Sequence, residues 1–167
     1  LGATMILMPR WDRELAGRLI SRWKVTHWTN IPTMIIDLLG SPNFASFDLS
    51  NLSYLGGGGA AMPAAVAQRL EEQYGLKYAE GYGLTETAGP SHSNSPDRPK
   101  QQCLGIPFLS TDSRVVDPET LRELPQGEPG EIVTHGPEVF QGYWKRSEAT
   151  AEDIFELVCM QCFRTGD

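Results

Sequence analysis

The feature that most constrains the fold is an alternation of strand-like and helix-like segments in the first half of the chain. Short β-rich runs at 25–30, 52–57 and 76–83 are separated by segments whose apolar residues recur at helical spacing. Parallel strands need crossover connections of helix length, and this rhythm supplies them. The sequence therefore predicts an α/β fold built on a parallel sheet.

Capping residues mark the ends of the expected helices. Asp12 can cap the first helix with its carboxylate, and Gly75 can end the third in a left-handed conformation. The expected helices cover residues 12–24, 32–39 and 63–74. An apolar run at 2–8 also predicts a buried strand at the start of this region.

The composition changes after about residue 90, where proline and glycine become frequent. The apolar runs shorten to "SRVVD" at 113–117 and "GEIVTHG" at 130–136, separated by the turn "PQGEPG". Such spacing is typical of a β-meander. We therefore expect an α/β subdomain over residues 1–104 and a smaller, mainly β subdomain over residues 105–167.

Charge and cysteine content exclude several classes of protein. The net charge is −7 with scattered Lys and Arg, which argues against nucleic acid as a partner. The longest apolar run, Met5–Met8, is too short to span a bilayer, so only a peripheral membrane contact stays open. Three cysteines do not form a disulfide framework and predict a reducing, cytoplasmic setting.

Two glycine-rich turns each follow a predicted strand, at Gly56–Gly59 and at Gly81 with Gly83. Loops at the carboxyl ends of parallel strands line the ligand crevice, and glycine lets backbone N–H groups approach a flat or anionic ligand. Tight turns without a ligand are the alternative interpretation. Neither turn matches the G-x-x-x-x-G-K-[ST] or G-x-G-x-x-G phosphate motifs.

The second turn is followed by residue types that suit a nucleotide. A hydroxyl such as that of Thr85 can donate to a phosphate oxygen, and a carboxylate such as that of Glu86 can bind Mg²⁺. Tyr82 offers an aromatic face to a base. From spacing alone, an N-capping Thr85 followed by a solvated Glu86 is the favoured alternative.

Four motifs resemble those of one superfamily. "EGYGLTETAG" at 80–89 is similar to the signature of adenylate-forming enzymes, which include acyl-CoA synthetases, firefly luciferase and peptide-synthetase adenylation domains. "GGGGAAMP" at 56–63, "GEIVTHGPEVFQGYWKRSEAT" at 130–150 and "FRTGD" at 163–167 resemble further motifs of this superfamily, in family order. The amino-acid sequences of these motifs are most similar to those of medium- and long-chain fatty-acyl-CoA ligases.

The resemblance implies roles for individual residues. Tyr82 would stack on adenine, Thr85 would contact the α-phosphate, and Asp167 would bond the ribose hydroxyls. Thr85 and Glu86 are the expected catalytic residues, and Glu86 is the expected Mg²⁺ ligand. The expected nucleotide-binding set is Gly59, Ala60, Glu80, Gly81, Tyr82, Thr85 and Asp167. The expected acyl-binding set is Gly58, Gly59 and Gly83.

By the same resemblance, the whole enzyme would activate a fatty acid with ATP and Mg²⁺ as acyl-AMP and transfer it to coenzyme A. The family's Ser/Thr/Gly-rich phosphate loop is absent from residues 1–167. We therefore expect a central fragment of a larger N-terminal domain, inactive alone and partnered by the rest of its own chain. An amino-acid-activating adenylation domain is an alternative, although no acidic residue for a substrate amine is obvious. A non-catalytic nucleotide or acyl-AMP binding module is another.

Cys159 and Cys162 stand where relatives of this superfamily carry an Asp-Gly turn before the "RTGD"-like motif. C-x-x-C spacing occurs in redox and zinc sites. A zinc site would need two more ligands, and only Cys103 and three dispersed histidines remain. We therefore interpret the pair as incidental.

Overall fold

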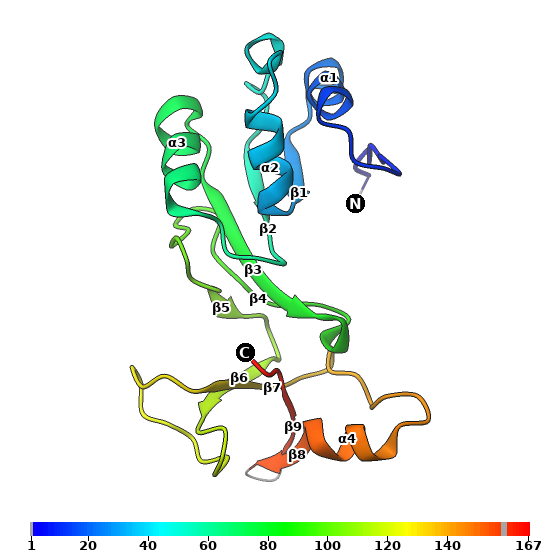
Figure 1. Cartoon of the computed structure of the whole chain (residues 1–167), viewed down its shortest axis with the longest axis vertical. Helices are drawn as coiled ribbons and strands as arrows, with labels where there is room; N and C mark the ends of the chain where they lie inside the picture. The colour runs from blue at the N-terminus through cyan, green and yellow to red at the C-terminus, as the bar shows by residue number, and fades with distance from the viewer. Residues whose placement is uncertain (1, 158–159) are drawn as a thin grey trace. The chain divides into compact units, whose positions relative to one another are not determined.

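The computed structural model describes residues 2–157 and 160–167, and the chain divides into two compact units. The first unit comprises the residues up to Tyr82 together with Asn94–Gly105. The second comprises Gly83–Ser93 and Ile106–Asp167. Figure 1 traces both units along the chain, from the blue N-terminus to the red C-terminus.

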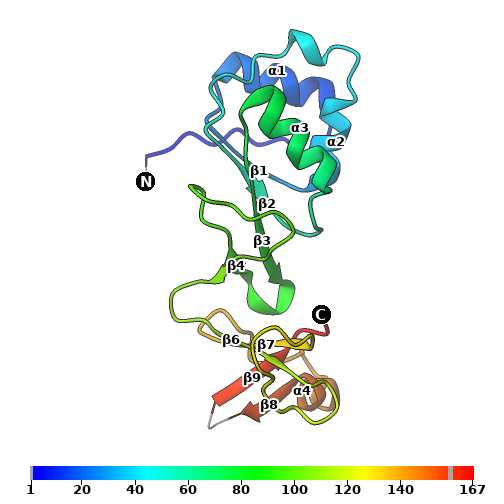
Figure 2. The same ribbon diagram turned by 90° about the vertical axis from the view of Figure 1, so that its left-hand side faces the viewer.

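The first unit is an α/β fold with parallel strand pairing, as the sequence predicts. Strand β1 pairs with β2, and β2 pairs with β3, both in parallel register. Helices α1 and α2 pack against each other and lie side by side in both views (Figures 1 and 2). Its elements are α1 (Arg13–Trp23), β1 (His27–Asn30), α2 (Pro32–Leu39), a short 3-10 turn η1 (Phe44–Ser46), β2 (Tyr54–Gly57), α3 (Ala64–Tyr74) and β3 (Tyr78–Leu84), whose last two residues belong to the second unit.

The predicted caps are confirmed. The Asp12 carboxylate accepts a hydrogen bond from the Leu15 N–H at 2.8 Å, which satisfies a donor that the first turn of α1 would otherwise leave unpaired. Gly75 ends α3 with φ of 65°, a conformation that costs glycine little. These local signals therefore set the helix ends.

One apolar core stabilises the first unit. Tyr78 closes it on the β3 side, and its hydroxyl donates to the Asn30 carbonyl oxygen at 3.3 Å. Burial, followed by the nearby Glu80 carboxylate, raises the pKa of Tyr78 to about 12. The buried apolar side chains are Ile20, Ile35, Leu38, Leu52, Leu55, Met62, Ala67, Leu70, Leu76 and Tyr78.

The second unit is mainly β, also as predicted. Its principal sheet has the antiparallel order β6-β7-β9-β8, and Val116, Val133 and Cys162 of its strands are buried in a small apolar core. Strand β4 pairs antiparallel with β5. Its remaining elements are the 3-10 turn η2 (Thr85–Thr87), β4 (Gly89–Ser93), β5 (Ile106–Pro107), β6 (Asp112–Val116), β7 (Glu131–His135), α4 (Ser147–Asp153), β8 (Ile154–Leu157) and β9 (Met160–Arg164). The division into subdomains at residues 1–104 and 105–167 stays a prediction.

The expected strand at 2–8 is wrong. These residues form no regular secondary structure, and Met5 and Leu7 are 78% and 79% exposed. A strand needs a neighbour to satisfy its N–H and C=O groups, and none of the strands in the described part of the chain pairs with this segment. Apolar composition alone therefore did not determine its structure.

The C-x-x-C pair is only partly visible. Cys162 is a buried free thiol in β9, and burial raises its pKa. Cys159 lies outside the described residues, so the interpretation of the pair as incidental stays a prediction. Within the described ranges, no helix combines the length and apolarity that crossing a bilayer requires.

Candidate functional site

The glycine-rich segment Gly56–Gly59 packs against β3 in the first unit. The expected second turn at Gly81 and Gly83 is wrong, because both glycines lie within strand β3 (Tyr78–Leu84). A Cβ on Gly58 would overlap the carbonyl oxygen of Gly81, so the two backbones approach as closely as they do only because a side chain is missing. Gly59 has φ of +83°, which places it in the region that favours glycine. Gly58, Gly59 and Gly81, which sequence reasoning assigned to ligand binding, are therefore neighbouring backbone in one unit.

Glu80 is buried next to this segment, and its carboxylate bonds to backbone. One oxygen accepts the Met62 N–H at 3.2 Å, and the other accepts the Gln102 N–H at 2.6 Å. The Glu80 carbonyl oxygen also accepts the Asn94 N–H at 2.9 Å. Glu80 therefore ties β3 to both neighbouring loops, and its expected part in nucleotide binding stays a prediction.

The two threonines of the turn η2 differ in burial and in hydrogen bonding. Thr87 is buried, its hydroxyl donates towards the carbonyl oxygens of Leu84 (3.0 Å) and Gly89 (2.7 Å), and its oxygen accepts the Leu84 N–H at 2.9 Å. Thr85 is exposed, and its hydroxyl has no partner among the residues that the structure describes. The capping role that sequence reasoning considered for Thr85 thus belongs to Thr87, which leaves the Thr85 hydroxyl available to a ligand.

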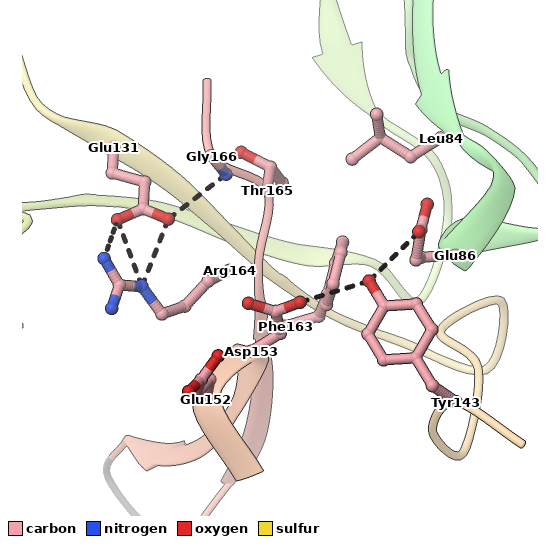
Figure 3. A pocket seen from close by; sticks show the side chains of 10 residues that line it. All are labelled: Leu84, Glu86, Glu131, Tyr143, Glu152, Asp153, Phe163, Arg164, Thr165 and Gly166. Carbon is pink, nitrogen blue, oxygen red and sulfur yellow. Dashed lines mark hydrogen bonds and ion pairs between the residues drawn. The ribbon is translucent and has the colours of Figure 1, made fainter. Parts of the chain in front are cut away.

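Residues Phe140 and Tyr143 of one loop each form a hydrogen bond with Glu86. Its carbonyl oxygen accepts the Phe140 N–H at 2.7 Å, and Oε1 of its carboxylate accepts the Tyr143 hydroxyl at 3.1 Å. The same hydroxyl lies 3.1 Å from Oδ2 of Asp153, so one phenol faces two carboxylates (Figure 3). Desolvation first, and then these two acceptors, raise the pKa of Tyr143 to about 12.

A pocket of about 560 Å³ opens beside Glu86, and every residue that lines it belongs to the second unit. Figure 3 shows carboxylates on several sides of it and the Phe163 ring between them. The lining residues are Leu84, Glu86, Glu131, Tyr143, Glu152, Asp153, Phe163, Arg164, Thr165 and Gly166.

The "RTGD" segment forms one side of this pocket and is fixed to β7. Arg164 pairs with the buried Glu131 at 2.6 Å, and the Gly166 N–H donates to the same carboxylate at 3.2 Å. The Arg164 guanidinium, assisted by this N–H, holds the pKa of Glu131 below its usual value. The Thr165 hydroxyl donates to the Ile132 carbonyl oxygen at 2.7 Å. The backbone leading to the exposed Asp167 is therefore well anchored.

The predicted site residues divide between the units. The second unit contains Gly83, Thr85, Glu86 and Asp167. Sequence reasoning missed Tyr143 and Asp153, although Tyr143 lies within the quoted motif at 130–150. The first unit contains Gly58, Gly59, Ala60, Glu80, Gly81 and Tyr82.

The residues present fit a magnesium ion held by one carboxylate. Oε1 of Glu86 bonds to Tyr143, whereas Oε2 has no partner in the described part of the chain and the pocket lies beside it. Mg²⁺ keeps most of its waters and takes one or two protein carboxylates, so a cage is not needed. The described residues contain no cluster of three or more His, Cys, Asp or Glu suited to a metal.

Gly83→Ala is expected to destabilise the second unit. A Cβ there would overlap the Gly89 carbonyl oxygen and lie 2.7 Å from Cα of Pro90, both of which are backbone atoms. Such overpacking typically costs about 1–3 kcal/mol. In the full-length protein, the temperature of thermal unfolding should fall, and kcat/KM should fall by the same factor for substrates of every size. Gly89→Ala is the matched control, because no atom lies within 4 Å of its Cβ position.

A loss of kcat/KM that grows with substrate length, without a change in thermal unfolding, would contradict this expectation. It would favour the acyl-binding role that the resemblance implies for Gly83. The chain-length series separates the two, because instability lowers the rate with every substrate alike.

The α/β unit with its glycine-rich segment and the antiparallel β unit are those of the N-terminal domain of adenylate-forming enzymes. The ATP-bound structure of MatB from Rhodopseudomonas palustris superposes with a TM-score of 0.87 and 31% identity, over 98% of this chain and 31% of that one. The long-chain-fatty-acid-CoA ligase of Archaeoglobus fulgidus superposes with a TM-score of 0.86 and 28% identity, over 94% of this chain and 34% of that one.

The chain belongs to the family of AMP-binding enzymes, whose model matches residues 1–144. A long-chain-fatty-acid–CoA ligase of Bacillus subtilis is 38% identical over 152 residues, which are 90% of this chain and 27% of that protein. The chain thus spans under a third of the length of this relative. The resemblance drawn from the four motifs is confirmed.

Proposed function

We propose that the whole protein is an ATP-dependent fatty-acyl-CoA ligase. The fatty carboxylate attacks the α-phosphorus of ATP, which forms acyl-AMP and releases pyrophosphate. The thiolate of coenzyme A then displaces AMP to form the thioester. Membership of the AMP-binding family and the similarity to a long-chain-fatty-acid–CoA ligase support this assignment.

The residues of this chain contribute binding and positioning. The Thr85 hydroxyl donates to an oxygen of the α-phosphate, and the Glu86 carboxylate holds Mg²⁺, which neutralises phosphate charge when bound. Tyr82 stacks on adenine beside Gly59, Ala60, Glu80 and Gly81, and Asp167 accepts from the ribose hydroxyls. Gly58 and Gly59 border the acyl chain, whereas Gly83 packs against the backbone of Gly89 and Pro90.

The observation that carries the proposal is the contrast within η2. Thr87 is committed to the turn by three hydrogen-bonding contacts, whereas Thr85 is exposed and Glu86 keeps one oxygen without a partner in the described residues. This pair is therefore the part of the motif that we assign to the ligand.

Acid-dependent exchange of labelled pyrophosphate into ATP by the full-length protein tests the function. Fatty acids of increasing length should support exchange, and coenzyme A should then yield the thioester. Exchange with amino acids alone would favour the amino-acid-activating alternative. Nucleotide binding without exchange for any acid would favour the non-catalytic module.

Residues 1–167 expressed alone are expected to give no acid-dependent exchange. The reason is that this sequence contains no Ser/Thr/Gly-rich phosphate loop for the β- and γ-phosphates of ATP. The same exchange assay, calibrated with the full-length protein, measures it. Exchange that depends on the fatty acid and disappears in Glu86→Gln would contradict this expectation.

A further inference from the structure

The loop formed by residues 140–143 contacts Glu86 through both its backbone and its side chain. The Phe140 N–H donates to the Glu86 carbonyl oxygen at 2.7 Å, and the Tyr143 hydroxyl lies 3.1 Å from Oε1 of the Glu86 carboxylate. These contacts are 54 and 57 residues apart in sequence, counted from Glu86 to Phe140 and from Glu86 to Tyr143. One loop therefore controls where η2 lies and where its carboxylate points.

The loop is itself firmly held. The Tyr143 N–H donates to the Thr150 hydroxyl at 2.9 Å, and the Phe140 ring packs edge-on against the rings of Tyr143 (4.7 Å) and Phe163 (5.5 Å). A half-buried phenol restrained in this way cannot follow a freely rotating carboxylate. It therefore fixes the rotamer of the carboxylate that it contacts.

Asp153 is the second possible acceptor for the Tyr143 hydroxyl. A phenol has one proton to donate, and Asp153 and Glu86 lie equally far from the oxygen, at 3.1 Å. Asp153, at the end of α4, can therefore hold the Tyr143 hydroxyl in place even when the Glu86 carboxylate does not accept its hydrogen bond. Figure 3 shows the phenol directed between the two carboxylates.

We propose that Tyr143 is a positioning residue for Glu86, whose Oε1 it holds so that Oε2 is directed to a divalent cation. This inference rests on the proposed function, because the cation is that of the ATP complex. In this proposal Tyr143 acts through Glu86 and contacts neither substrate nor metal itself. Groups that orient a metal ligand typically change metal affinity about 10- to 100-fold when they are removed.

The test measures binding, not turnover. Mn²⁺ replaces Mg²⁺ in the full-length protein with α,β-methylene-ATP, which does not react, and water proton relaxation reports the enzyme-bound Mn²⁺–nucleotide complex. Tyr143→Phe keeps the ring that packs against Phe140 and removes only the hydroxyl. It should weaken Mn²⁺ binding about tenfold. Tyr78→Phe, which also loses a buried hydroxyl contact, should bind Mn²⁺ like the wild type.

A double-mutant cycle separates positioning from general damage. If Tyr143 acts through Glu86, Tyr143→Phe should add no further loss in a Glu86→Gln background. Additive losses, or wild-type affinity in Tyr143→Phe alone, would overturn the inference while leaving the proposed function intact. If Glu86→Gln binds Mn²⁺ as tightly as the wild type, the metal role in the proposed function fails and this inference fails with it.

A second variant protects the test against misfolding of Tyr143→Phe. Thr150→Val keeps the side-chain shape and removes the acceptor that anchors the Tyr143 N–H. It should also weaken Mn²⁺ binding, but by a smaller factor than Tyr143→Phe does, about threefold. Wild-type affinity in a folded Thr150→Val protein would contradict the restraint on the loop.

Discussion

Glu86→Gln in the full-length enzyme is expected to lower the rate of acyl-adenylate formation about 100-fold at limiting Mg²⁺. Glutamine keeps the size of the side chain and an oxygen that can still accept the Tyr143 hydroxyl. It removes only the negative charge proposed to bind Mg²⁺. Raising the Mg²⁺ concentration should therefore restore part of the rate. Acid-dependent pyrophosphate exchange over a Mg²⁺ series measures both effects.

Glu119→Gln is the matched control for this prediction. Glu119 is exposed in the same unit, and its side chain lines no part of the pocket. Equal rates for Glu86→Gln and the wild type at limiting Mg²⁺ would remove the metal role from Glu86. A loss that Mg²⁺ does not relieve would indicate that the charge acts elsewhere in the step.

Arg164→Met is expected to destabilise the second unit by about 3 kcal/mol at pH 7. Glu131 is only 8% exposed, and the substitution leaves its carboxylate buried without its cation. Arg164 also donates to the Pro118 carbonyl oxygen at 3.3 Å, a contact that is lost as well. Hydrogen exchange of the β7 and β9 amides in the full-length protein, corrected for the intrinsic rate, measures the effect. Arg122→Met, at an exposed arginine of the same unit, is the control.

The effect of Arg164→Met depends on pH in a direction that the ion pair sets. The folded-state pKa of Glu131 is lowered from its ordinary value of 4.5, chiefly by Arg164. Its stabilising contribution is therefore complete above pH 4.5 and is lost as the pH falls through the lower folded-state pKa. The difference between wild type and Arg164→Met should shrink below pH 4.5. A difference that is constant from pH 7 to pH 3 would contradict the ion-pair explanation.

Local signals in the sequence determined much of the fold. Asp12 and Gly75 set helix ends because a cap acts on backbone groups within a few residues. The parallel strands of the first unit followed from alternation that is visible along the chain. The prediction of a strand at 2–8 was wrong because a strand depends on a hydrogen-bonding partner strand, which no local sequence pattern supplies.

The sequence by itself also identified the family, because each of the four motifs is a contiguous stretch of residues and their order along the chain is visible without a structure. Which threonine of η2 serves the turn was decided by the tertiary structure, since Thr87 is buried against Leu84 and Gly89. The same holds for the partners of Glu86 and Glu131, which lie 57 residues away at Tyr143 and 33 residues away at Arg164. Spacing along a chain reports only neighbours within a helix turn or a strand pleat. Contacts between distant segments exist only after strands pair and loops pack, so only the folded structure assigns them.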